Sequence, residues 1–328
     1  MKKRVLITGA SGFVGYHLIE EALQNNFEVY AAVRKSSDIS HLKNFHIQYV
    51  NLDFGSIIAL KKDMQEKQYD YIIHAAGVTS ARSVAEYETV NATYTFNLAA
   101  AAVAADVNLK GFVFISSLAA VGPLDTLNGI ITQETPPRPI TAYGKSKLMA
   151  EEQLRSITSL NYTILRPTAV YGPRDKGIFI FFKQLSKGFE PYIGSEAQKL
   201  SFIYVKDLAR VAVKALYINN QNTYNLSDGN FYDKYELATI TKNILNLRTL
   251  KIHLPVNFVK LLASVTEKVS SLNNKAAILT PEKLKELIAV NWSCDIEQAK
   301  ADLGYYPNYD LDAGLKETLE WYKTNKWL

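Results

Sequence analysis

The chain has 328 residues, of which 48% are hydrophobic and 21% are charged. This composition is typical of a globular protein, and the length suffices for one large domain or two modest ones. The formal charge of +5 is small for such a length and is not gathered into clusters of lysine and arginine. We therefore expect no nucleic acid as partner, whereas an anionic small molecule would suit the chain.

The cysteine content and the apolar runs predict a cytoplasmic protein. The single cysteine, Cys294, excludes an internal disulfide, and with no cysteine and histidine cluster near it we expect a packed side chain and no metal site. No secretory signal is visible. The longest uncharged apolar run, residues 94–105, is shorter than the roughly 20 residues that cross a bilayer, so no transmembrane segment is expected.

Residues 4–8 are predicted to form a buried strand, and a turn with three glycines follows directly. Gly9 allows a tight exit from the strand, Gly12 lets backbone N–H groups approach phosphate oxygens, and Gly15 lets the next helix pack close to the sheet. The N-terminus of that helix offers unpaired N–H donors and partial positive charge. The spacing is a variant of the general dinucleotide fingerprint, and it predicts a site for a nucleotide pyrophosphate.

The first half of the chain alternates β-branched runs with helical patterns, which predicts a parallel sheet covered on both faces. Further strands are predicted at residues 28–33, 46–50, 71–74, 112–116 and 162–166. Helices are predicted at residues 18–24, 57–66, 94–107 and 143–156. The expected fold is α/β, a Rossmann-type doubly wound sheet whose ligand crevice lies at the carboxyl ends of the strands.

After Tyr171 the alternation stops. Residues 179–185 are aromatic and irregular, and residues 200–207 read as a strand that enters a helix at residues 208–217. Residues 223–226 can add a last strand to the sheet.

From residue 232 onward the patterns are mostly helical. Pro255 and Pro281 each open a predicted helix, and Asp295 and Gly304 bound a later one as its N-cap and C-cap residues. We therefore expect a smaller, mostly helical substrate-binding domain that closes over the crevice. The expected division is a nucleotide-binding domain of residues 1–171 plus about 204–226, and a substrate-binding domain of residues 172–203 plus 227–328.

The end of the second strand indicates which cofactor binds. In this fold an acidic residue there selects NAD, whereas an arginine suits the 2′-phosphate of NADP. The chain has Arg34 and Lys35 at this point and no carboxylate before Asp38. We therefore predict NADP(H), with NAD(H) as the alternative if Arg34 is only a solvated cation. Asp53, after the third strand, either accepts a hydrogen bond from the adenine amino group or forms a turn.

Three stretches together predict carbonyl or alcohol chemistry. Tyr143 and Lys147 lie four residues apart on one face of a helix. A tyrosine with a pKa of about 10 is a poor acid or base at neutral pH, but a lysine ammonium one turn away and an oxidised nicotinamide would favour its phenolate. Ser116 and Ser117 end the fifth strand, where a hydroxyl can hold a substrate oxygen. Residues 74–77 follow the fourth strand and would let a cofactor lie close to the backbone.

The combined pattern resembles the extended short-chain dehydrogenases/reductases, which form the NAD-dependent epimerase/dehydratase family. This group includes nucleotide-sugar epimerases, dehydratases, dihydroflavonol reductases and hydroxysteroid dehydrogenases. The matching stretches cover nearly the whole chain. They are Thr8 through Gly15, His74-Ala75-Ala76-Gly77, Val90-Asn91-Ala92-Thr93, Ile115-Ser116-Ser117, Tyr143-Gly144-Lys145-Ser146-Lys147, Leu165 through Pro173, Ile203 through Ala209, and Trp292 through Tyr305.

The resemblance implies a role for each motif. Tyr143 is expected to be the general acid/base, Lys147 to bond the nicotinamide ribose and lower the pKa of the tyrosine, and Ser117 to polarise the substrate oxygen. A homodimer would pair the helices that follow Asn91 and Tyr143, although the alanine-rich residues 99–105 could equally be intrachain core. The residues expected at the cofactor are Thr8, Gly9, Ser11, Gly12, Phe13, Val14, Gly15, Arg34, Lys35, Asp53, Phe54, Ala75, Ala76, Gly77, Ser116, Tyr143, Lys147, Pro167, Thr168 and Val170.

Two departures from the epimerase pattern bear on the substrate. Epimerases usually carry an arginine for the substrate diphosphate where this chain has Leu200, and the neighbouring Lys199 lacks the bidentate fork of arginine. The tyrosine that follows the serines in epimerases is also missing, because the stretch reads Ala120-Val121-Gly122. Both features, like Arg34, resemble the dihydroflavonol reductase and hydroxysteroid dehydrogenase branches.

The helix after Pro255 has one apolar face. As a wall of the substrate cleft, this face would suit a lipid-, sphingoid-, steroid- or flavonoid-like ketone. Packing against the core is the simpler interpretation and the one we favour, and peripheral contact with a membrane is a third. The residues of the face are Phe258, Leu261, Leu262, Val265, Val269 and Leu272.

These observations predict an NADP(H)-dependent oxidoreductase that interconverts a ketone and a secondary alcohol on a hydrophobic substrate. The alternative is a nucleotide-sugar epimerase or dehydratase, in which the cofactor is reduced and reoxidised within one cycle. A non-enzymatic NADP sensor is disfavoured, because a sensor has no need of Ser117, Tyr143 and Lys147.

Overall fold

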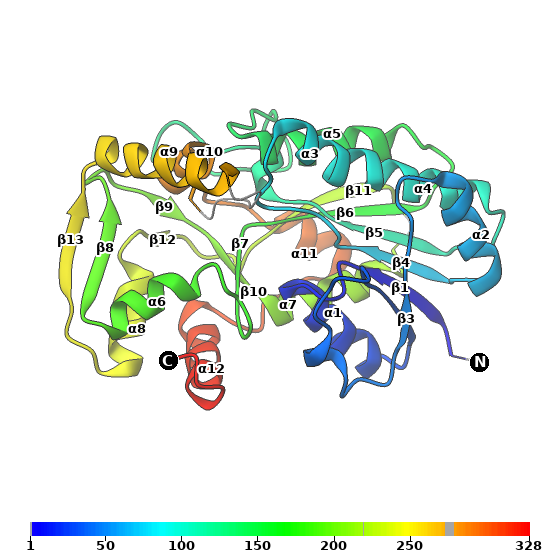
Figure 1. Cartoon of the computed structure of the whole chain (residues 1–328), viewed down its shortest axis with the longest axis horizontal. Coiled ribbons are helices and arrows are strands. Elements are labelled where there is room, and N and C mark those ends of the chain that lie inside the picture. The colour runs from blue at the N-terminus through cyan, green and yellow to red at the C-terminus, as the bar shows by residue number, and fades with distance from the viewer. Residues whose placement is uncertain (1, 219, 273–278) are drawn as a thin grey trace.

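The computed structural model describes residues 2–218, 220–272 and 279–328, and its centre is a sheet of seven parallel strands (Figure 1). The strand order is β11-β6-β5-β4-β1-β2-β3. The direction of winding reverses between β1 and β4, which is where doubly wound sheets bind their ligands. The Rossmann-type α/β fold is therefore confirmed. The strands are β1 (Arg4–Thr8), β2 (Glu28–Ala32), β3 (Gln48–Val50), β4 (Tyr71–His74), β5 (Gly111–Ile115), β6 (Tyr162–Pro167) and β11 (Asn222–Leu226).

Helices cover both faces of this sheet, as the layers in Figure 1 show. In β1, Val5 and Ile7 face one core and Leu6 faces the other, and all three are fully buried. This double burial explains why the strand reads as a continuous apolar run. One face is covered by α1 (Phe13–Gln24), α7 (Val205–Ala215) and α11 (Glu297–Leu303). The other face is covered by α2 (Ile57–Lys67), α4 (Tyr94–Ala104) and α5 (Ala142–Arg155).

Short helices join the larger elements near the carboxyl ends of the strands. The segment α3 (Val84–Tyr87) runs into the π-helical η2 (Glu88–Thr93) and then into α4. The 3-10 helices η1 (Ser40–Leu42) and η3 (Leu118–Ala120) follow β2 and β5. These connections place short, rigid segments around the predicted ligand crevice.

A third core, rich in aromatic residues, lies on the left in Figure 1. It includes the fully buried rings of Tyr171, Tyr204 and Tyr322. Its helices are α6 (Phe179–Ser186), α8 (Glu236–Leu245) and α12 (Leu311–Thr324). Three two-stranded sheets accompany them: β7 (Ala169–Tyr171) with β10 (Phe202–Tyr204), β8 (Phe189–Ile193) with β13 (Leu250–Leu254), and β9 (Lys199–Leu200) with β12 (Tyr232–Asp233).

The structure corrects several predictions about the elements. Helix α7 begins at Val205 rather than at residue 208, and Ile296 rather than Asp295 is the N-cap residue of α11. Residues 179–185 are not irregular but form α6, which buries Phe182 and Leu185 from one helical face. The helix of the glycine turn begins at Phe13 rather than at residue 18, directly after Gly12. The predicted C-cap Gly304 is confirmed, with φ +55° at the end of α11.

The alanine-rich residues of α4 belong to the chain's own core. Ala99, Ala101, Ala102 and Ala105 are all buried in the core between the sheet and the helices that cover this face. Intrachain packing, one of the two alternatives predicted for these alanines, is therefore what the structure shows.

The helix α9 (Val256–Leu272), packed against α10 (Pro281–Leu287), does not bury its predicted apolar face. Phe258, Leu261, Leu262 and Val265 are 50%, 63%, 43% and 49% exposed. The favoured interpretation, packing of this face against the core, is therefore wrong for these four residues. In the described part of α9 the buried side chains are Val259 and Ala263 instead. The predicted face also included Val269 and Leu272, whose side chains lie outside the described residues.

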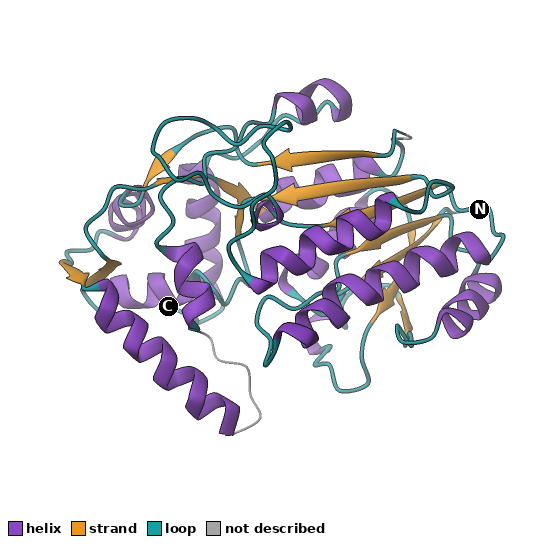
Figure 2. Cartoon of the chain, turned by 90° about the horizontal axis from the view of Figure 1, so that it is seen from above, coloured by secondary structure: helices purple, strands orange, loops and turns teal. Residues whose placement is uncertain are grey.

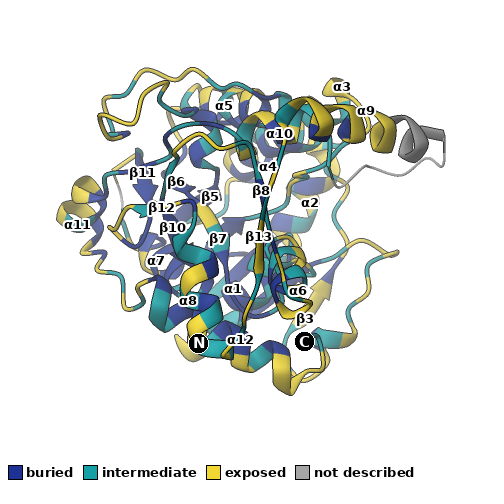
Figure 3. Cartoon of the chain, turned by 90° about the vertical axis from the view of Figure 1, so that its left-hand side faces the viewer, coloured by how far each residue is buried: buried dark blue, intermediate teal, exposed yellow. Residues whose placement is uncertain are grey.

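The position of α9 agrees with this exposure. In Figure 2 the long helix that leads into the grey segment projects at the lower left, and Figure 3 shows much of its outer surface as exposed. Among the helices that the structure describes, none combines the length and the apolar character that crossing a bilayer requires.

Candidate active site

The glycine turn after β1 brings backbones so close that side chains would separate them. Gly9 has φ +69°, and a Cβ there would lie 2.5 Å from the carbonyl oxygen of Ala75, in the loop after β4. A Cβ on Gly15 would lie 2.2 Å from the Gly9 carbonyl oxygen. Gly12 is the N-cap residue of α1, and no side chain caps the helix there. The first-turn N–H groups of α1 are therefore suited to bind phosphate oxygens, and the cradle fits a dinucleotide.

Three further predicted residues occupy this turn. Val14 packs against the sheet core, and the ring of Phe13 meets His17 edge-on at 5.9 Å. Ser11 is partly exposed, and its backbone is hydrogen-bonded to the His41 side chain. The side chains of Phe13 and Val14 thus contact protein, which leaves their backbone N–H groups as the atoms suited to a phosphate.

A buried hydrogen-bond chain ties β1 to the loop after β4. Thr8 Oγ1 lies 2.7 Å from His74 Nδ1 and accepts a hydrogen bond from the Ala76 N–H at 3.1 Å. His74 Nε2 lies 2.9 Å from Thr95 Oγ1, whose own proton goes to the Asn91 carbonyl. A proton on Nε2 is the tautomer that satisfies all these contacts. Burial lowers the pKa of His74 to about 3, so the ring is a neutral structural link.

Asn91 holds the loop that carries Gly77 against the catalytic helix. Its Oδ1 accepts from the Val78 N–H at 2.8 Å, and its Nδ2 donates to the Val78 carbonyl and to Ser146 Oγ on α5, at 3.0 and 2.9 Å. A Cβ on Gly77 would lie 3.0 Å from Asn91 Oδ1 and 3.4 Å from Lys147 Nζ. The predicted cofactor loop and the predicted catalytic lysine are therefore neighbours.

Tyr143 is brought next to Ser117 by a close approach of α5 to η3. A Cβ on Gly144 would lie only 2.3 Å from the Ala119 carbonyl oxygen. Ser117 is the N-cap residue of η3, where its hydroxyl accepts from the Ala119 N–H at 3.2 Å. Its side chain also lies close enough to Tyr143 to lower the pKa of the phenol. The structure thus brings together the two hydroxyls that the sequence predicted to meet a substrate oxygen.

Lys147 is buried one helical turn after Tyr143. Its Nζ donates to the Ile115 carbonyl at 2.9 Å and lies 4.7 Å from the centre of the Phe114 ring. Burial lowers the pKa of Lys147 to about 8. Burial also raises the pKa of Tyr143 well above its ordinary value, and the Ser117 hydroxyl lowers it only in part. The lowering of this pKa by Lys147 together with an oxidised nicotinamide stays a prediction.

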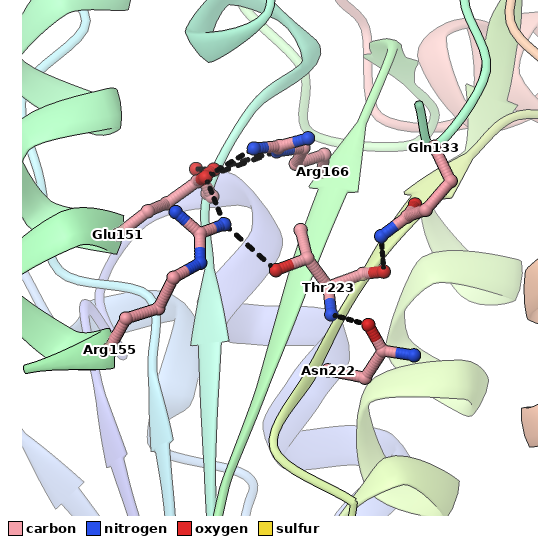
Figure 4. Close-up of polar contacts among 7 residues, drawn as sticks. Gln133, Glu151, Arg155, Arg166, Asn222 and Thr223 are labelled. Atoms are coloured by element: carbon pink, nitrogen blue, oxygen red, sulfur yellow. Dashed lines mark hydrogen bonds and ion pairs between the residues drawn. The ribbon is translucent and has the colours of Figure 1, made fainter. Parts of the chain in front are cut away.

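A buried ion-pair network joins α5 to β6 (Figure 4). The fully buried carboxylate of Glu151 on α5 accepts from Arg166 Nε at 2.9 and 3.2 Å and from Arg166 Nη2 at 2.5 Å. Arg155 Nη2 reaches the same carboxylate at 3.0 Å. Ser116 Oγ donates to Glu151 at 2.6 Å. The Ser116 hydroxyl is therefore engaged with the buried Glu151 carboxylate. A contact between Ser116 and a cofactor would use the other atoms of the residue.

The predicted adenosine end of the site is open to solvent. Arg34 and Lys35 are exposed directly after β2. Asp53 Oδ1 accepts from the Gly55 N–H at 3.0 Å, so the turn-forming role is present, while the predicted adenine contact stays a prediction. Phe54 is partly buried against the core that α2 and α4 cover.

A second group of cations, which the sequence analysis missed, faces the glycine turn from the loop after β7. The guanidinium of Arg174 lies 4.0 Å from the centre of the Tyr16 ring, and that ring is 6.1 Å from the ring of His41. Burial lowers the pKa of His41, and the charges of Arg174 and Lys176 lower it further. Positive charge from the 174–176 segment thus lies over Tyr16 of α1 and near His41. The one signal in the sequence for this group of cations is that Arg174 directly follows the matching stretch Leu165 through Pro173.

The residues predicted beside the nicotinamide follow β6. Pro167 ends that strand in register with Leu226 of β11, and Val170 lies in β7. Thr168 is 9% exposed, and its Oγ1 is a buried oxygen without a hydrogen-bond partner among the residues described. A buried hydroxyl in this state suits a ligand that supplies the missing partner.

Two carboxylates that the sequence analysis also missed reach the start of the catalytic helix. Thr141 Oγ1 donates to Glu286 Oε1 at 2.8 Å, and the Ala142 N–H donates to Glu282 Oε2 at 2.9 Å. Both glutamates belong to α10, more than a hundred residues further along the chain. No local pattern around Tyr143 could have indicated them.

Three other residues considered in the sequence analysis, Lys199, Leu200 and Cys294, contact other parts of the protein. Lys199 Nζ lies 5.2 Å from the centre of the Phe231 ring, and Leu200 is partly buried in the aromatic core. Cys294 is buried, as predicted, and burial raises the pKa of its thiol. Within the described ranges, no group of three or more histidine, cysteine, aspartate or glutamate residues could hold a metal ion.

Comparison with known proteins places this site in a family. Residues 5–227 match the model of the NAD dependent epimerase/dehydratase family. A ceramide reductase of Caulobacter vibrioides is 26% identical over 326 residues, which cover 99% of this chain and 96% of the relative. A decarboxylating sterol-4-alpha-carboxylate 3-dehydrogenase of Candida albicans is 27% identical over 341 residues, with 97% of each chain covered.

A solved structure supports the fold. The UDP-glucose 4-epimerase of Thermotoga maritima, solved with UDP-glucose, has a TM-score of 0.81 and 22% identity, covering 98% of this chain and 99% of that one. At this identity the likeness concerns the fold alone. The family model spans well over half of the chain, from β1 to the end of β11. The chain therefore belongs to the NAD dependent epimerase/dehydratase family.

Proposed function

We propose that the protein is an NADP(H)-dependent oxidoreductase that interconverts a ketone and a secondary alcohol. The observation that carries this proposal is the contact between Tyr143 and Ser117 at the end of β5, one helical turn from the buried Lys147. Two hydroxyls in contact can hold one carbonyl oxygen and deliver a proton to it. The glycine cradle beside them fits the cofactor that such a reaction needs.

In the direction of reduction, Ser117 donates a hydrogen bond to the carbonyl oxygen and Tyr143 transfers its phenolic proton to that oxygen. The reduced nicotinamide, when bound, supplies the hydride that completes the alcohol at the carbonyl carbon. Burial keeps Tyr143 protonated at neutral pH, as a general acid must be. Lys147, held by the Ile115 carbonyl, has further N–H donors for the cofactor ribose.

The preference for NADP(H) is supported by charge at the adenosine end. Arg34 and Lys35 follow β2. Arg174 and Lys176, from the loop after β7, lie close enough to His41 in the segment after β2 for their charges to lower its pKa. Asp38, the nearest carboxylate on the β2 side, accepts a hydrogen bond from the Ser40 N–H at 2.9 Å. Some related structures were solved with NAD, including a dTDP-glucose 4,6-dehydratase of Bacillus anthracis. The preference therefore rests on the cations of this chain.

We further propose a hydrophobic substrate, lipid-, sphingoid-, steroid- or flavonoid-like, bound between the sheet and residues 172–203 plus 227–328. The names of two relatives, a ceramide reductase and a sterol dehydrogenase, support this class. The side chains at the position where epimerases carry a diphosphate-binding arginine support it too. Leu200 packs in the aromatic core, and the Lys199 ammonium lies over Phe231.

The second candidate function is a nucleotide-sugar epimerase or dehydratase. It is favoured by the similarity of the chain to a UDP-glucose 4-epimerase of Vibrio cholerae, which is 28% identical over 330 residues. The two candidates differ in their use of cofactor. A reductase consumes NADPH in proportion to product, whereas an epimerase turns over with no net change in cofactor.

We also infer that the protein acts in the cytoplasm, for which the single cysteine is the support, and that it forms a homodimer. Val103 on α4 and Met149 on α5 are exposed, and pairing of these two helices across a dimer would cover them. Sedimentation velocity distinguishes the dimer from a monomer.

The proposed reaction is tested by NADPH oxidation with 3-ketosphinganine, a 3-keto steroid, a dihydroflavonol and UDP-glucose. We expect turnover with one of the ketones, and Tyr143→Phe should abolish it while NADPH still binds. Tyr217→Phe, far from the site and half exposed, serves as the matched control. Retained turnover in Tyr143→Phe would overturn the proposal, and UDP-glucose turnover without net NADPH loss would establish the second candidate.

A further inference from the structure

Helix α10 holds the first turn of the catalytic helix with two carboxylates. Glu286 Oε1 accepts from Thr141 Oγ1 at 2.8 Å, and the same hydroxyl accepts from the Gly144 N–H at 3.0 Å. Thr141 is therefore both the N-cap of α5 and the link to Glu286. Glu282 Oε2 accepts from the Ala142 N–H at 2.9 Å. Negative charge at a helix N-terminus is favourable, and here it comes from a distant segment of the chain.

The two carboxylates differ in their exposure. The Glu286 side chain is 12% exposed, whereas that of Glu282 is 42% exposed. The second oxygen of Glu286 pairs with the exposed Lys283 Nζ at 2.8 Å, and Glu282 pairs with Lys285. A charge that is largely withdrawn from water is screened less and acts further through the protein. Glu286 is thus the carboxylate better placed to influence its neighbours.

The groups around Tyr143 come from four elements. Ser117 of η3 lies close enough to lower its pKa, and the Tyr87 ring of α3 lies 6.2 Å from its ring. Lys147 is buried one turn along its own helix, and Glu286 faces it from α10. Burial is the first cause that raises the pKa of Tyr143, and the charge of Glu286 raises it further. Burial likewise raises the pKa of Tyr87, so Glu286 is the negative charge in this set at neutral pH.

We propose that Glu286 is a positioning residue for the reaction, which holds the first turn of the catalytic helix through Thr141 and places a carboxylate on the Tyr143 side of that turn. The proposal rests on the function of Tyr143 proposed above. It means that a residue of α10, outside the nucleotide-binding sheet, sets the acidity of the catalytic hydroxyl. A tyrosine kept protonated favours the reduction of a ketone over the oxidation of an alcohol.

The test is the pH profile of NADPH oxidation by Glu286→Gln, measured with 3-ketosphinganine or the fastest ketone of the panel above. Glutamine keeps an oxygen that accepts from Thr141 but removes the charge. Loss of a negative charge lowers the pKa of Tyr143, so the tyrosine loses its proton at lower pH. We expect the alkaline limb of kcat to move to lower pH.

Glu282→Gln is the matched control, because it alters the neighbouring cap without removing the charge that faces Tyr143. Its alkaline limb should stay at the position of the unmodified protein, whatever its effect on thermal stability. An unmoved limb in Glu286→Gln overturns the proposal, and so does an equal movement in both variants. A second measurement needs no substrate: the phenolate absorbance of the NADP⁺ complex, taken as the difference from Tyr143→Phe, should appear at lower pH in Glu286→Gln.

The failure of this inference is distinguishable from the failure of the proposed function. If Tyr143→Phe keeps its turnover, Tyr143 is not the acid and the proposed function fails. If Tyr143→Phe is inactive while Glu286→Gln has the unmodified pH profile, the function stands and the role of Glu286 is refuted.

Discussion

At position 144 the first turn of α5 passes η3 with room for a hydrogen atom but not for a methyl group. The obstacle is the Ala119 carbonyl oxygen, 2.3 Å from the place of a Cβ, and it belongs to a backbone that cannot swing aside. We predict that Gly144→Ala moves α5 away from η3 and separates Tyr143 from Ser117. Stability should fall by about 1–3 kcal/mol, measured by urea unfolding, and kcat should fall more than NADPH affinity.

Gly177→Ala is a suitable control for this substitution. The nearest atom to a Cβ at position 177 is a side-chain oxygen of Asp175 at 3.3 Å, and the residue is exposed. Its stability should stay within about 0.5 kcal/mol of the unmodified protein. Equal losses in the two variants would contradict the special role of Gly144.

Arg34 offers the second prediction at this scale. If its guanidinium binds the 2′-phosphate, Arg34→Ala should weaken NADPH binding about tenfold or more and leave NADH binding nearly unchanged. Fluorescence titration with both cofactors measures the difference. Lys62→Ala, an exposed cation on α2, is the matched control. Equal weakening for NADPH and NADH would show that Arg34 does not read the phosphate.

Single residues could be predicted from the sequence where a local motif carries them. Tyr143, Lys147 and the three glycines of the first turn lie in short runs whose spacing reflects one helix or one turn. Glu286 and Arg174 have no such local pattern, because their role depends on contacts between segments far apart in the chain. Burial of Tyr143, which raises its pKa, likewise depends on the folded chain and has no local pattern in the sequence.

Among the elements, α9 shows how an amphipathic pattern can point the wrong way. The predicted apolar face is exposed at Leu261, and the buried residue is Val259, two positions away. We predict that Val259→Ala lowers stability by about 1–3 kcal/mol, because it removes buried methyl groups. Leu261→Ala should change stability by less than about 0.5 kcal/mol. Urea unfolding of the two variants distinguishes them, and an equal or larger loss in Leu261→Ala would contradict the observed burial.

The strands of the central sheet were predictable to within two residues at their ends, because burial on both faces makes them continuous apolar runs bounded by polar or glycine residues. The elements of the aromatic core were not. The strands β8 and β13 went unpredicted, since their pairing joins residues about sixty positions apart and both expose part of their length. Helix α6 went unpredicted because its run of aromatic residues, of which Phe182 is buried and Phe179 and Phe181 are partly buried, obscures the helical period.

For the whole molecule, the order of the sheet predicts which fragments can fold. A fragment of residues 1–171 lacks β11, which pairs with β6, and α7, which covers one core. We predict that this fragment has no cooperative urea transition and aggregates through the open edge of β6. A fragment of residues 1–227 contains all seven strands and should be markedly more soluble in the same size-exclusion and circular-dichroism measurements. A cooperative transition in the shorter fragment would contradict this view.

The late arrival of β11 also bears on how the chain is made. The strand at the edge of the sheet is synthesised well after the strand that it pairs with, and α6, β8 and α7 are made in between. During translation the edge of β6 is therefore unpaired, and the sheet face that α7 covers is exposed, until these later elements are made. Unpaired edges and exposed apolar surface make incomplete chains prone to wrong association. The glycine turn is synthesised long before β11, so the sheet that carries it is complete only once residue 226 has been made. The exposure of the β6 edge during synthesis is thus a property of the strand order itself.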